Sequence, residues 1–282
     1  MNNAGKLYVV ATPIGNLGDF SPRAVEALRS ADFIAAEDTR VTAKLLNHFE
    51  IKKPLVSYYQ HNMYERGEAV IERILGGDTC ALCSDAGTPA VSDPGELLVK
   101  QAIDAGIEVV PIPGACAAIT ALCASGLVTG RFVFEGFIPV NRKCRKERLE
   151  EIKNETRTLI FYEAPHKLKN TLADMLAVFG DREMTLAREL TKLHEEIVKT
   201  TLSAANEAYA EREPRGEYVL VVSGKSEDET KKEATSEDAL DIVNRLLSEG
   251  HTLSEACKQA AAITNRKKGE LYKLALNNRD TE

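Results

Sequence analysis

The chain has 282 residues, of which 44% are hydrophobic and 28% charged, and its net charge is −7. This length allows one large domain, or two smaller ones with an appendage, and the composition is that of an ordinary globular protein. No run approaches the roughly 20 continuous apolar residues of a membrane span, and the first ten residues show no signal-peptide pattern. We therefore expect a cytoplasmic protein with no membrane partner. The acidic charge disfavours a nucleic-acid partner without excluding one, because local basic patches can override the total.

Short apolar runs alternate with helix-like segments over residues 1–125. Strands are predicted at 6–11, 33–38, 54–59, 79–84 and 107–112, with helices between them, the first capped by Ser21 ahead of Pro22. This alternation predicts an α/β domain with a mainly parallel sheet covered on both faces, whose ligands lie beyond the carboxyl ends of the strands. Cys80 and Cys83 have C-x-x-C spacing, but no second pair completes a zinc site. We interpret them as small buried hydrophobes and expect no metal.

The pattern changes after residue 125. Five strand-like runs at 132–137, 157–164, 183–190, 195–202 and 217–224, with helices near 143–153, 165–179 and 203–212, predict a second α/β domain over 126–223 with a mixed sheet. Residues 224–235 are a polar linker. Residues 236–282 then predict three short helices, with capping-box spacing between Thr252 and Glu255. This segment is either a helix-turn-helix unit that contacts RNA or a packing appendage.

Three glycine-rich loops follow predicted strands, at 11–19, 84–95 and 111–118. None has the G-x-G-x-x-G or G-x-x-x-x-G-K-[ST] pattern of a nucleotide-phosphate site, and the carboxylates of Asp85 and Asp93 would oppose a phosphate. Asp93 is expected to be the N-cap of a helix that begins at Pro94. Asp85 lies at a strand end with no helix to cap, so it either contacts a ligand or forms an Asx-turn.

These loops, read in order, resemble those of a known family. The segments "TPIGNLGDFSPRA", "AEDTR", "SDAGTPAVSDPG", "PGACAAITAL" and "FYEAPHKL" are similar to the tetrapyrrole-methylase superfamily, and most similar to its bacterial branch that methylates a cytidine ribose 2′-hydroxyl in small-subunit ribosomal RNA. The resemblance covers residues 7–223 and extends to the C-terminal helices. It implies two α/β domains with S-adenosylmethionine in the cleft between them, a homodimer, and 16S rRNA as partner, with cytidine 1402 as the target.

The resemblance also implies which residues contact the cofactor. They lie in the three glycine-rich loops and on the second domain, and are Pro13, Asp85, Gly87, Thr88, Pro89, Pro113, Gly114, Cys116, Ala117, Tyr162 and Gly216. One departure matters: related sequences commonly have Pro-Ser where this chain has Ala115-Cys116. Cys116 is therefore expected to contribute only its backbone.

A ribose hydroxyl needs a proton acceptor before it can accept a methyl group. The segment "AEDTR" supplies candidate catalytic residues at the end of the second strand, with Arg40 holding an RNA phosphate and a carboxylate of Glu37 or Asp38 nearby as acceptor. The alternative is that Asp38 only caps the next helix while Arg40 lies on the surface. His166, at a helix start, either belongs to the cap region or reaches the cleft.

Candidate RNA-binding residues lie outside the glycine-rich loops. They are His61 and Asn62 after the third strand, the basic run with Arg142, Lys143, Arg145 and Lys146, and the C-terminal cluster of Arg266, Lys267 and Lys268. The alternative for the basic run is a solvated charged face. Two other functions stay open: methylation of a tetrapyrrole or other small molecule on the same fold, and a non-enzymatic regulator that binds nucleic acid through its C-terminal helices.

Overall fold

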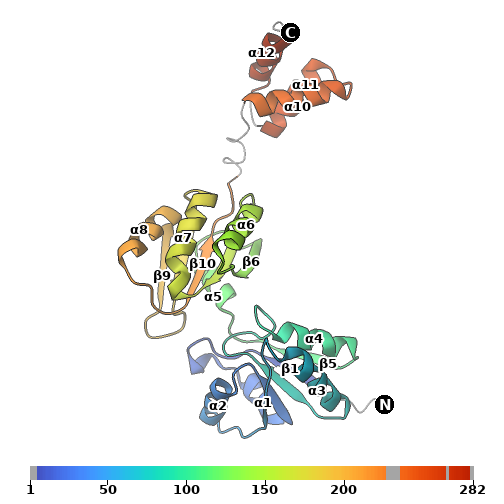
Figure 1. The fold of residues 1–282 in the computed structure, drawn as a ribbon, viewed down its shortest axis with the longest axis vertical. Helices are drawn as coiled ribbons and strands as arrows, with labels where there is room; N and C mark the ends of the chain where they lie inside the picture. The colour runs from blue at the N-terminus through green and yellow to red at the C-terminus, as the bar shows by residue number, and fades with distance from the viewer. Residues whose placement is uncertain (1–4, 227–235, 265–266, 280–282) are drawn as a thin grey trace.

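The structure, a computed structural model, describes residues 5–226, 236–264 and 267–279. It contains two α/β units followed by a group of three helices (Figure 1). This confirms the predicted fold class.

The first unit is built on a parallel five-stranded sheet of order β3-β2-β4-β1-β5. Its central strands consist of apolar residues that are buried on both faces, as helices on both sides of a parallel sheet require. The strands are β1 (Lys6–Val10), β2 (Phe33–Ala36), β3 (Leu55–Ser57), β4 (Cys80–Cys83) and β5 (Glu108–Ile112).

Helices cover the two faces of this sheet with separate cores. Ala24, Leu28 and Leu46 of α1 and α2 pack on one face, while α3 and α4 pack on the other. Cys80 belongs to one core and Cys83 to the other, so the two thiols lie on opposite faces of the sheet, and burial raises the pKa of each to about 12. The helices are η1 (Leu17–Asp19), α1 (Pro22–Ser30), α2 (Thr39–His48), α3 (Met63–Leu75) and α4 (Gly95–Asp104). The predicted cap of α1 is confirmed, since Ser21 accepts the Ala24 N–H.

The second unit has a mixed five-stranded sheet of order β6-β7-β10-β8-β9. Only β6 and β7 are parallel, and the other neighbours are antiparallel, as the closely spaced strand runs predicted. Helices α6, α7 and α8 cover one face around a core that includes Phe161 and Leu220. The elements are β6 (Phe132–Phe137), α6 (Arg142–Ile152), β7 (Thr158–Glu163), α7 (Pro165–Phe179), β8 (Glu183–Arg188), β9 (Glu196–Thr201), α8 (Leu202–Glu211) and β10 (Tyr218–Val222).

Helix α5 (Ala117–Ala124) joins the two units. Its residues Ala118, Ala121 and Leu122 pack against Ile160 and Val221 on the face of the second sheet opposite to α6–α8. The sequence boundary at residue 125 places this helix with the first domain, whereas its contacts are with β7 and β10 of the second. The chain therefore passes from the first sheet to the second just before α5, at the loop that follows β5.

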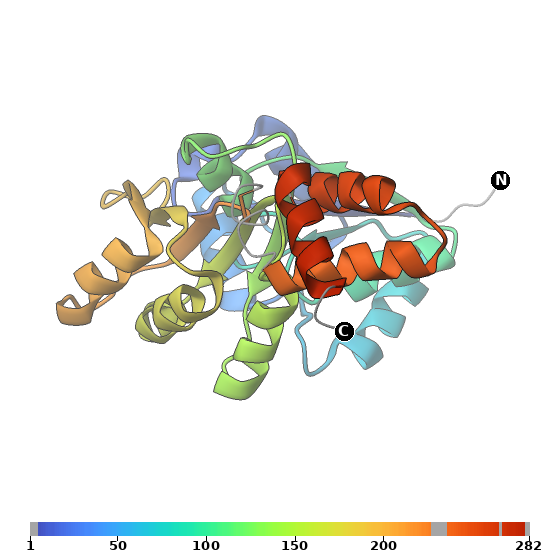
Figure 2. The same ribbon diagram turned by 90° about the horizontal axis from the view of Figure 1, so that it is seen from above.

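Residues 227–235, which make up most of the predicted linker, lie outside the described part of the chain. Three helices follow this segment. They are α10 (Ser236–Ser248), α11 (Leu253–Thr264) and α12 (Lys268–Arg279), and they pack on one another around a shared apolar core (Figure 2). The predicted capping box is present, because Thr252 and Glu255 exchange backbone-to-side-chain hydrogen bonds of 3.0 and 3.3 Å. In the described residues, every helix is too short or too polar to cross a membrane.

Candidate functional site

A cavity of about 600 Å³ lies where the carboxyl ends of the first sheet meet the second unit. Both units contribute to it, so the cleft expected between two domains is present. From the first unit and α5 it is lined by residues 14, 37, 84–88, 91–93, 116 and 117, and from the second by residues 137, 162–166, 190 and 217–219.

Hydrogen bonds join the three glycine-rich loops into one wall of this cavity. Thr12 and Gly87 exchange two backbone hydrogen bonds of 2.8 and 3.1 Å. The hydroxyl of Thr88 donates to the Ala115 carbonyl at 3.0 Å. Gly87 has φ of +84°, a conformation that favours glycine and lets the loop turn back toward the first strand. The loops that the sequence singled out are therefore held together as a unit.

Asp85 and Glu37 come together at the centre of the first-unit wall. The Asp85 Oδ1 accepts the Asp38 backbone N–H at 2.9 Å, and the Asp85 N–H lies 3.5 Å from the Glu37 carboxylate. Burial raises the pKa of Glu37, and the neighbouring negative charge of Asp85 raises it further. Of the three predicted catalytic residues, Glu37 is the one that lines the cavity.

Asp38 and Arg40 are engaged with each other beside the cavity. Asp38 is the N-cap of α2 and accepts the Arg40 backbone N–H at 2.8 Å, while its Oδ2 pairs with the Arg40 guanidinium at 2.6 Å. These contacts lower the pKa of Asp38 to about 2. The Arg40 side chain is 87% exposed. The capping interpretation of Asp38 is thus confirmed, and Arg40 points a charged group into solvent next to the site.

Asp93 differs from its predicted role as a helix N-cap. Helix α4 begins one residue later than expected, with Pro94 in the N-cap position. The Asp93 carboxylate instead closes a turn by accepting the Ala90 and Gly95 N–H groups at 2.8 and 2.7 Å. Ala90 and Ser92 in this turn have φ of +66° and +63°, so Asp93 stabilises a strained backbone segment that lines the cavity.

Tyr162 connects the second sheet to α5. Its hydroxyl oxygen accepts the Ala118 N–H at 3.1 Å, in the first turn of a helix whose N-cap, Cys116, makes no side-chain cap. Burial raises the Tyr162 pKa to about 12. The ring packs edge-on against Phe137 at 5.5 Å. Cys116, Ala117 and Tyr162 all line the cavity.

Five of the eleven predicted cofactor residues do not line this cavity, but two of them have clear supporting roles. At Gly114 a Cβ atom would lie 2.9 Å from that of Ala11, so glycine permits two loops to pack closely. At Gly216, with φ of +80°, a Cβ would lie 2.5 Å from Glu189, whose carboxylate accepts the Glu217 N–H at 2.9 Å. The full set outside the lining is Pro13, Pro89, Pro113, Gly114 and Gly216.

Sequence reasoning missed several lining residues of the second unit. Phe137, Glu163, Leu190 and Val219 line the cavity, as does His166, for which a position in the cleft was one of two interpretations. They come from the ends of β6 and β7, the loop after β8 and the start of β10. In a mixed sheet, the order of strands along the chain does not show which strand ends meet at one edge. The family resemblance pointed to this region only by segment, through "FYEAPHKL", the loop after "TLAREL" and the strand that carries Gly216.

The lining is acidic. Five acidic residues line it, namely Glu37, Asp85, Asp93, Glu163 and Glu217, and within the described residues no lysine or arginine lines it. Glu163 pairs with Lys167 at 3.3 Å and Glu217 with Lys192 at 2.9 Å, and the other three form no ion pair with a described residue. Such a surface opposes phosphate and favours a cation. No group of three or more metal-ligating side chains suited to a metal ion occurs in the part of the chain that the structure describes.

The basic helix α6 requires one correction. Arg145 is only 6% exposed, and its guanidinium bonds Asp174 Oδ2 at 2.7 and 2.9 Å and the Val140 carbonyl at 2.9 Å. A buried, fully engaged guanidinium cannot contact RNA, so that prediction was wrong for Arg145. The basic run by itself does not show which of its residues face α7, and Arg145 is on that face.

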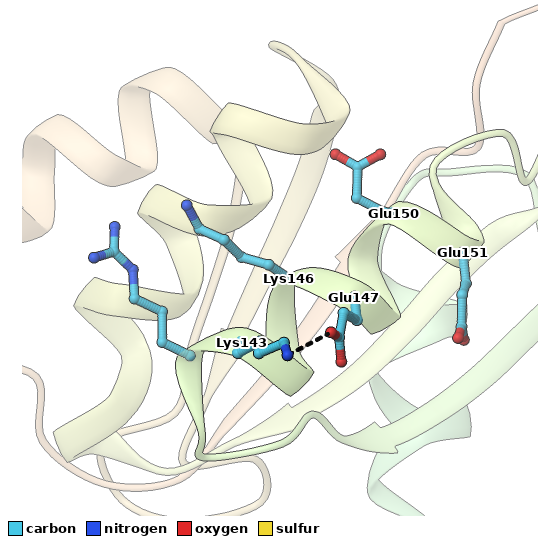
Figure 3. A pocket seen from close by; sticks show the side chains of 6 residues that line it. Lys143, Lys146, Glu147, Glu150 and Glu151 are labelled. Carbon is cyan, nitrogen blue, oxygen red and sulfur yellow. Dashed lines mark ion pairs between the residues drawn. The ribbon is translucent and has the colours of Figure 1, made fainter.

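The neighbouring cations of α6 are exposed. The side chains of Arg142, Lys143 and Lys146 are 76%, 85% and 45% exposed. They line a surface pocket in which Lys143 pairs with Glu147, and Glu150 and Glu151 lie farther along the helix (Figure 3). Arg142 and Lys146 each lie 3.9 Å from Asp174, which is already occupied by Arg145. Three cations therefore surround one carboxylate near the start of α6, while the three glutamates of the pocket lie farther along the helix.

The remaining RNA candidates have different surroundings. His61 is exposed. The Asn62 side chain instead stabilises the local turn, since it accepts the Tyr59 N–H at 2.8 Å and donates to the Ser57 carbonyl at 3.2 Å. Lys267 and Lys268 are exposed at the start of α12. Arg266 lies outside the described residues.

Comparison with known proteins agrees with this geometry. The family model of tetrapyrrole (corrin/porphyrin) methylases matches residues 6–206, which include the first sheet, every strand of the second sheet except β10, and the cavity lining except residues 217–219. A model described as the RsmI C-terminal HTH domain matches residues 233–279. Diphthine synthase has a similar structure, with a TM-score of 0.60 and 17% identity over 79% of this chain and 91% of that one. Uroporphyrin-III C-methyl transferase from Thermus thermophilus, in complex with S-adenosyl homocysteine, has a TM-score of 0.56 at 17% identity, over 78% of this chain and 97% of that one. Fold and cavity together are those of a methylase of the tetrapyrrole type.

Curated relatives are similar over nearly the whole chain. The ribosomal RNA small subunit methyltransferase I of Synechocystis sp. is 48% identical over 96% of this chain and 98% of that protein. The protein of the same name from Bacillus subtilis is 47% identical over 96% of this chain and 94% of its own length. The chain therefore belongs to the tetrapyrrole methylase family and, within it, to the ribosomal RNA small subunit methyltransferase I group.

Proposed function

We propose that this protein is an S-adenosylmethionine-dependent methyltransferase that methylates the ribose 2′-hydroxyl of a cytidine in the 16S rRNA of the small ribosomal subunit. The observation that carries this proposal is the acidic cavity between the two units of a chain that belongs to a methylase family. The names of its relatives supply the class of acceptor, ribosomal RNA of the small subunit.

The cavity fits this cofactor in size and in charge. Its volume of about 600 Å³ lies within the range of small-molecule sites. The cofactor carries a sulfonium and an ammonium group, which the carboxylate of Asp85 and its acidic neighbours would stabilise. The rings of Phe137 and Tyr162, with Leu190, offer apolar contacts for an adenine ring. When bound, S-adenosylmethionine supplies an electrophilic methyl group.

Glu37 is the proposed proton acceptor for the ribose hydroxyl. It is the predicted catalytic carboxylate that lines the cavity, and its raised pKa makes it a stronger base than an exposed glutamate. Asp38 is less suited, because its pairing with Arg40 lowers its pKa to about 2. Arg40 is proposed to hold an RNA phosphate beside the site with those N–H groups of its exposed guanidinium that Asp38 does not engage.

Exposed cations away from the cavity are proposed to bind the rRNA backbone. Arg142, Lys143 and Lys146 on α6, Lys267 and Lys268 on α12, and His61 contribute to this surface. A homodimer in the cytoplasm completes the proposal. The exposed apolar side chains of Val128 and Leu193, 75% and 93% exposed, are consistent with a further protein contact.

Methylation of a tetrapyrrole is the alternative that the fold alone would allow. The basic surface of α6 and the C-terminal helices argue against it, because a small-molecule methylase needs neither. The test is to give the pure protein labelled S-adenosylmethionine with small ribosomal subunits that lack the modification and, separately, with a tetrapyrrole. Label is expected in the rRNA only, and label in the tetrapyrrole alone would favour the alternative.

Cofactor binding is tested separately by calorimetric titration. Asp85→Ala is expected to weaken S-adenosylmethionine binding, because it removes a carboxylate from the cavity wall. Asp104→Ala, which removes an exposed carboxylate on α4 that pairs only with Lys100, is the matched control and should bind as wild type does. Equal affinity in wild type and Asp85→Ala would remove Asp85 from the proposed cofactor site.

A further inference from the structure

A second, smaller cavity of about 250 Å³ shares the wall formed by Ser84 and Asp85 with the large cavity. Its other walls come from the loop after β1 and from one side of α2. The lining residues from these walls include Pro13, Leu17, Val41, Thr42, Lys44 and Leu45. The cofactor proposal uses only Pro13 from this group, and Pro13 does not line the large cavity.

The walls of this smaller cavity are mainly apolar and accessible. Leu17 and Val41 are 42% and 38% exposed, and Pro13 and Leu45 lie beside them. Large apolar side chains grouped in an accessible hollow are typical of a surface that receives a flat apolar ligand face. An unstacked nucleobase has such a face.

Thr42 supplies a polar group without a partner. It is 2% exposed and lines the cavity, and its hydroxyl makes no hydrogen bond with any described residue. Buried hydroxyls without partners are costly and uncommon. A ligand with hydrogen-bonding groups on its edge would satisfy the Thr42 hydroxyl.

Lys44 adds a positive charge at the edge of the cavity. It is exposed and forms no ion pair within the described residues. An ammonium group left free beside an apolar hollow can bind the phosphate of a nucleotide whose base lies inside.

The volume limits the ligand to a single ring system. A cavity of about 150 Å³ can hold benzene, so 250 Å³ admits one substituted six-membered ring. A tetrapyrrole macrocycle would not fit. Enzymes that modify nucleotides in structured nucleic acid commonly move one nucleotide out of the stack into such a pocket.

We propose that this cavity is the subsite for the base of the target cytidine, with the base between the apolar side chains, Thr42 at its edge and Lys44 at its phosphate. This inference rests on the proposed function. The shared wall of Ser84 and Asp85 places the subsite directly beside the large cavity and Glu37. A base held here brings its ribose to the boundary between the two cavities.

The first test measures binding without activity. The full chain is labelled at its valine, leucine and isoleucine methyl groups and titrated with cytidine 5′-monophosphate in an NMR experiment. The resonances of Val41, Leu17 and Leu45 are expected to shift, while those of Ile103 on α4 should not. Resonances at the cavity that stay unchanged up to a saturating nucleotide concentration would overturn the proposal.

The second test uses two variants and a control. Val41→Phe fills the cavity, and Thr42→Val removes the hydroxyl but keeps the side-chain shape. Both should fold and bind S-adenosylmethionine as wild type does, since neither residue lines the large cavity. Val41→Phe should raise the KM for small ribosomal subunits about tenfold, a typical loss for one base contact. Thr42→Val should raise it less, and Ile103→Phe, at a more exposed apolar position on α4, should not change it.

The two proposals can fail independently. If wild type shows the nucleotide-induced shifts but transfers no methyl group to rRNA, the proposed function fails and the nucleotide subsite remains. If wild type methylates rRNA while Val41→Phe keeps a wild-type KM and wild-type titration shifts, the subsite proposal is wrong.

Discussion

Glu37 and Asp85 form an acidic pair whose two residues lie 48 positions apart in the sequence. Both follow strands of the same parallel sheet, and β2 and β4 are neighbours in it, so the strand order brings them together. The sequence predicted each as a separate candidate. It could not predict that their proximity and burial would raise the pKa of Glu37, because that depends on the order of the strands.

The proposed role of Glu37 has a pH signature. Replacing it by glutamine should reduce kcat about 100-fold, the lower range for loss of a general base. In wild type the rate should rise with pH as Glu37 ionises, and in Glu37→Gln that rise should be absent. Steady-state kinetics as a function of pH measures this. A variant with the wild-type rate and profile would exclude Glu37 as the proton acceptor.

The same residue makes a prediction about stability. A carboxyl group whose pKa is raised by folding stabilises the folded state fully below its ordinary value of 4.5, and this contribution is lost as the pH rises through the raised value. In Glu37→Gln this decrease in stability at higher pH does not occur, because glutamine does not ionise. Its Tm relative to wild type should therefore increase between about pH 4 and about pH 7. Thermal unfolding at both values tests this, and a difference that shrinks with pH would contradict the assigned direction.

Arg145 shows how one residue of a basic run can have a structural role. The run predicted a charged face, but helical periodicity turns Arg145 toward Asp174 of α7. Arg145→Met removes the close, buried partner of the Asp174 carboxylate and leaves only Arg142 and Lys146 at 3.9 Å, so it should lower the free energy of unfolding by about 3 kcal/mol. Arg142→Ala, at a mainly exposed position, should change stability little and weaken rRNA binding. Denaturant unfolding and rRNA-binding measurements on both variants test whether Arg145 stabilises the fold while Arg142 binds rRNA. Equal stability of the two variants would contradict this assignment.

Most elements were predictable because each has a local signal. The strands of both sheets are apolar runs, and caps such as Ser21 and the Thr252–Glu255 pair are set by side chains within three residues. Contacts between loops were not predictable. The Thr12–Gly87 and Thr88–Ala115 hydrogen bonds join segments far apart in the chain. The sequence could therefore place the cavity at the strand ends, but it could not predict which loop residues contact one another in its wall.

The loop before β10 gives a test at this scale. Gly216 and Gly180 have similar φ angles, +80° and +74°, but only Gly216 has a neighbour within reach of a Cβ atom. Gly180→Ala should therefore cost about 1 kcal/mol of backbone strain. Gly216→Ala should cost more and weaken cofactor binding, since Glu217–Val219 line the cavity and Glu189 holds the Glu217 N–H. Calorimetry and unfolding curves compare them, and equal effects would mean that the close approach of Glu189 is unimportant.

The charges of the whole molecule are distributed according to these proposed roles. The chain is acidic overall, with carboxylates in the cavity and exposed cations on α6 and at the start of α12. Net charge alone disfavours RNA as a partner, whereas the positions of the exposed cations and the names of the relatives support it. An acidic interior site and a basic exterior surface suit a cationic donor and an anionic acceptor.

The C-terminal helices should act on rRNA and not on the cofactor. Replacing Lys267 and Lys268 together by glutamine removes two exposed cations at the start of α12. The KM for small ribosomal subunits should rise. The slope of log affinity against log salt concentration should become shallower by about 2, because two lysine–phosphate contacts are lost. Cofactor affinity should not change. A salt dependence identical to wild type would assign these helices to packing.

The most direct test of the central claim is where the methyl group goes. Small ribosomal subunits lacking the modification are incubated with the protein and isotopically labelled S-adenosylmethionine, and the 16S rRNA is digested to nucleosides and analysed by mass spectrometry. We predict one labelled 2′-O-methylcytidine per subunit with wild type and a strongly reduced amount with Glu37→Gln. Label on a base, or no label in the rRNA while the protein still binds S-adenosylmethionine, would contradict the proposed function.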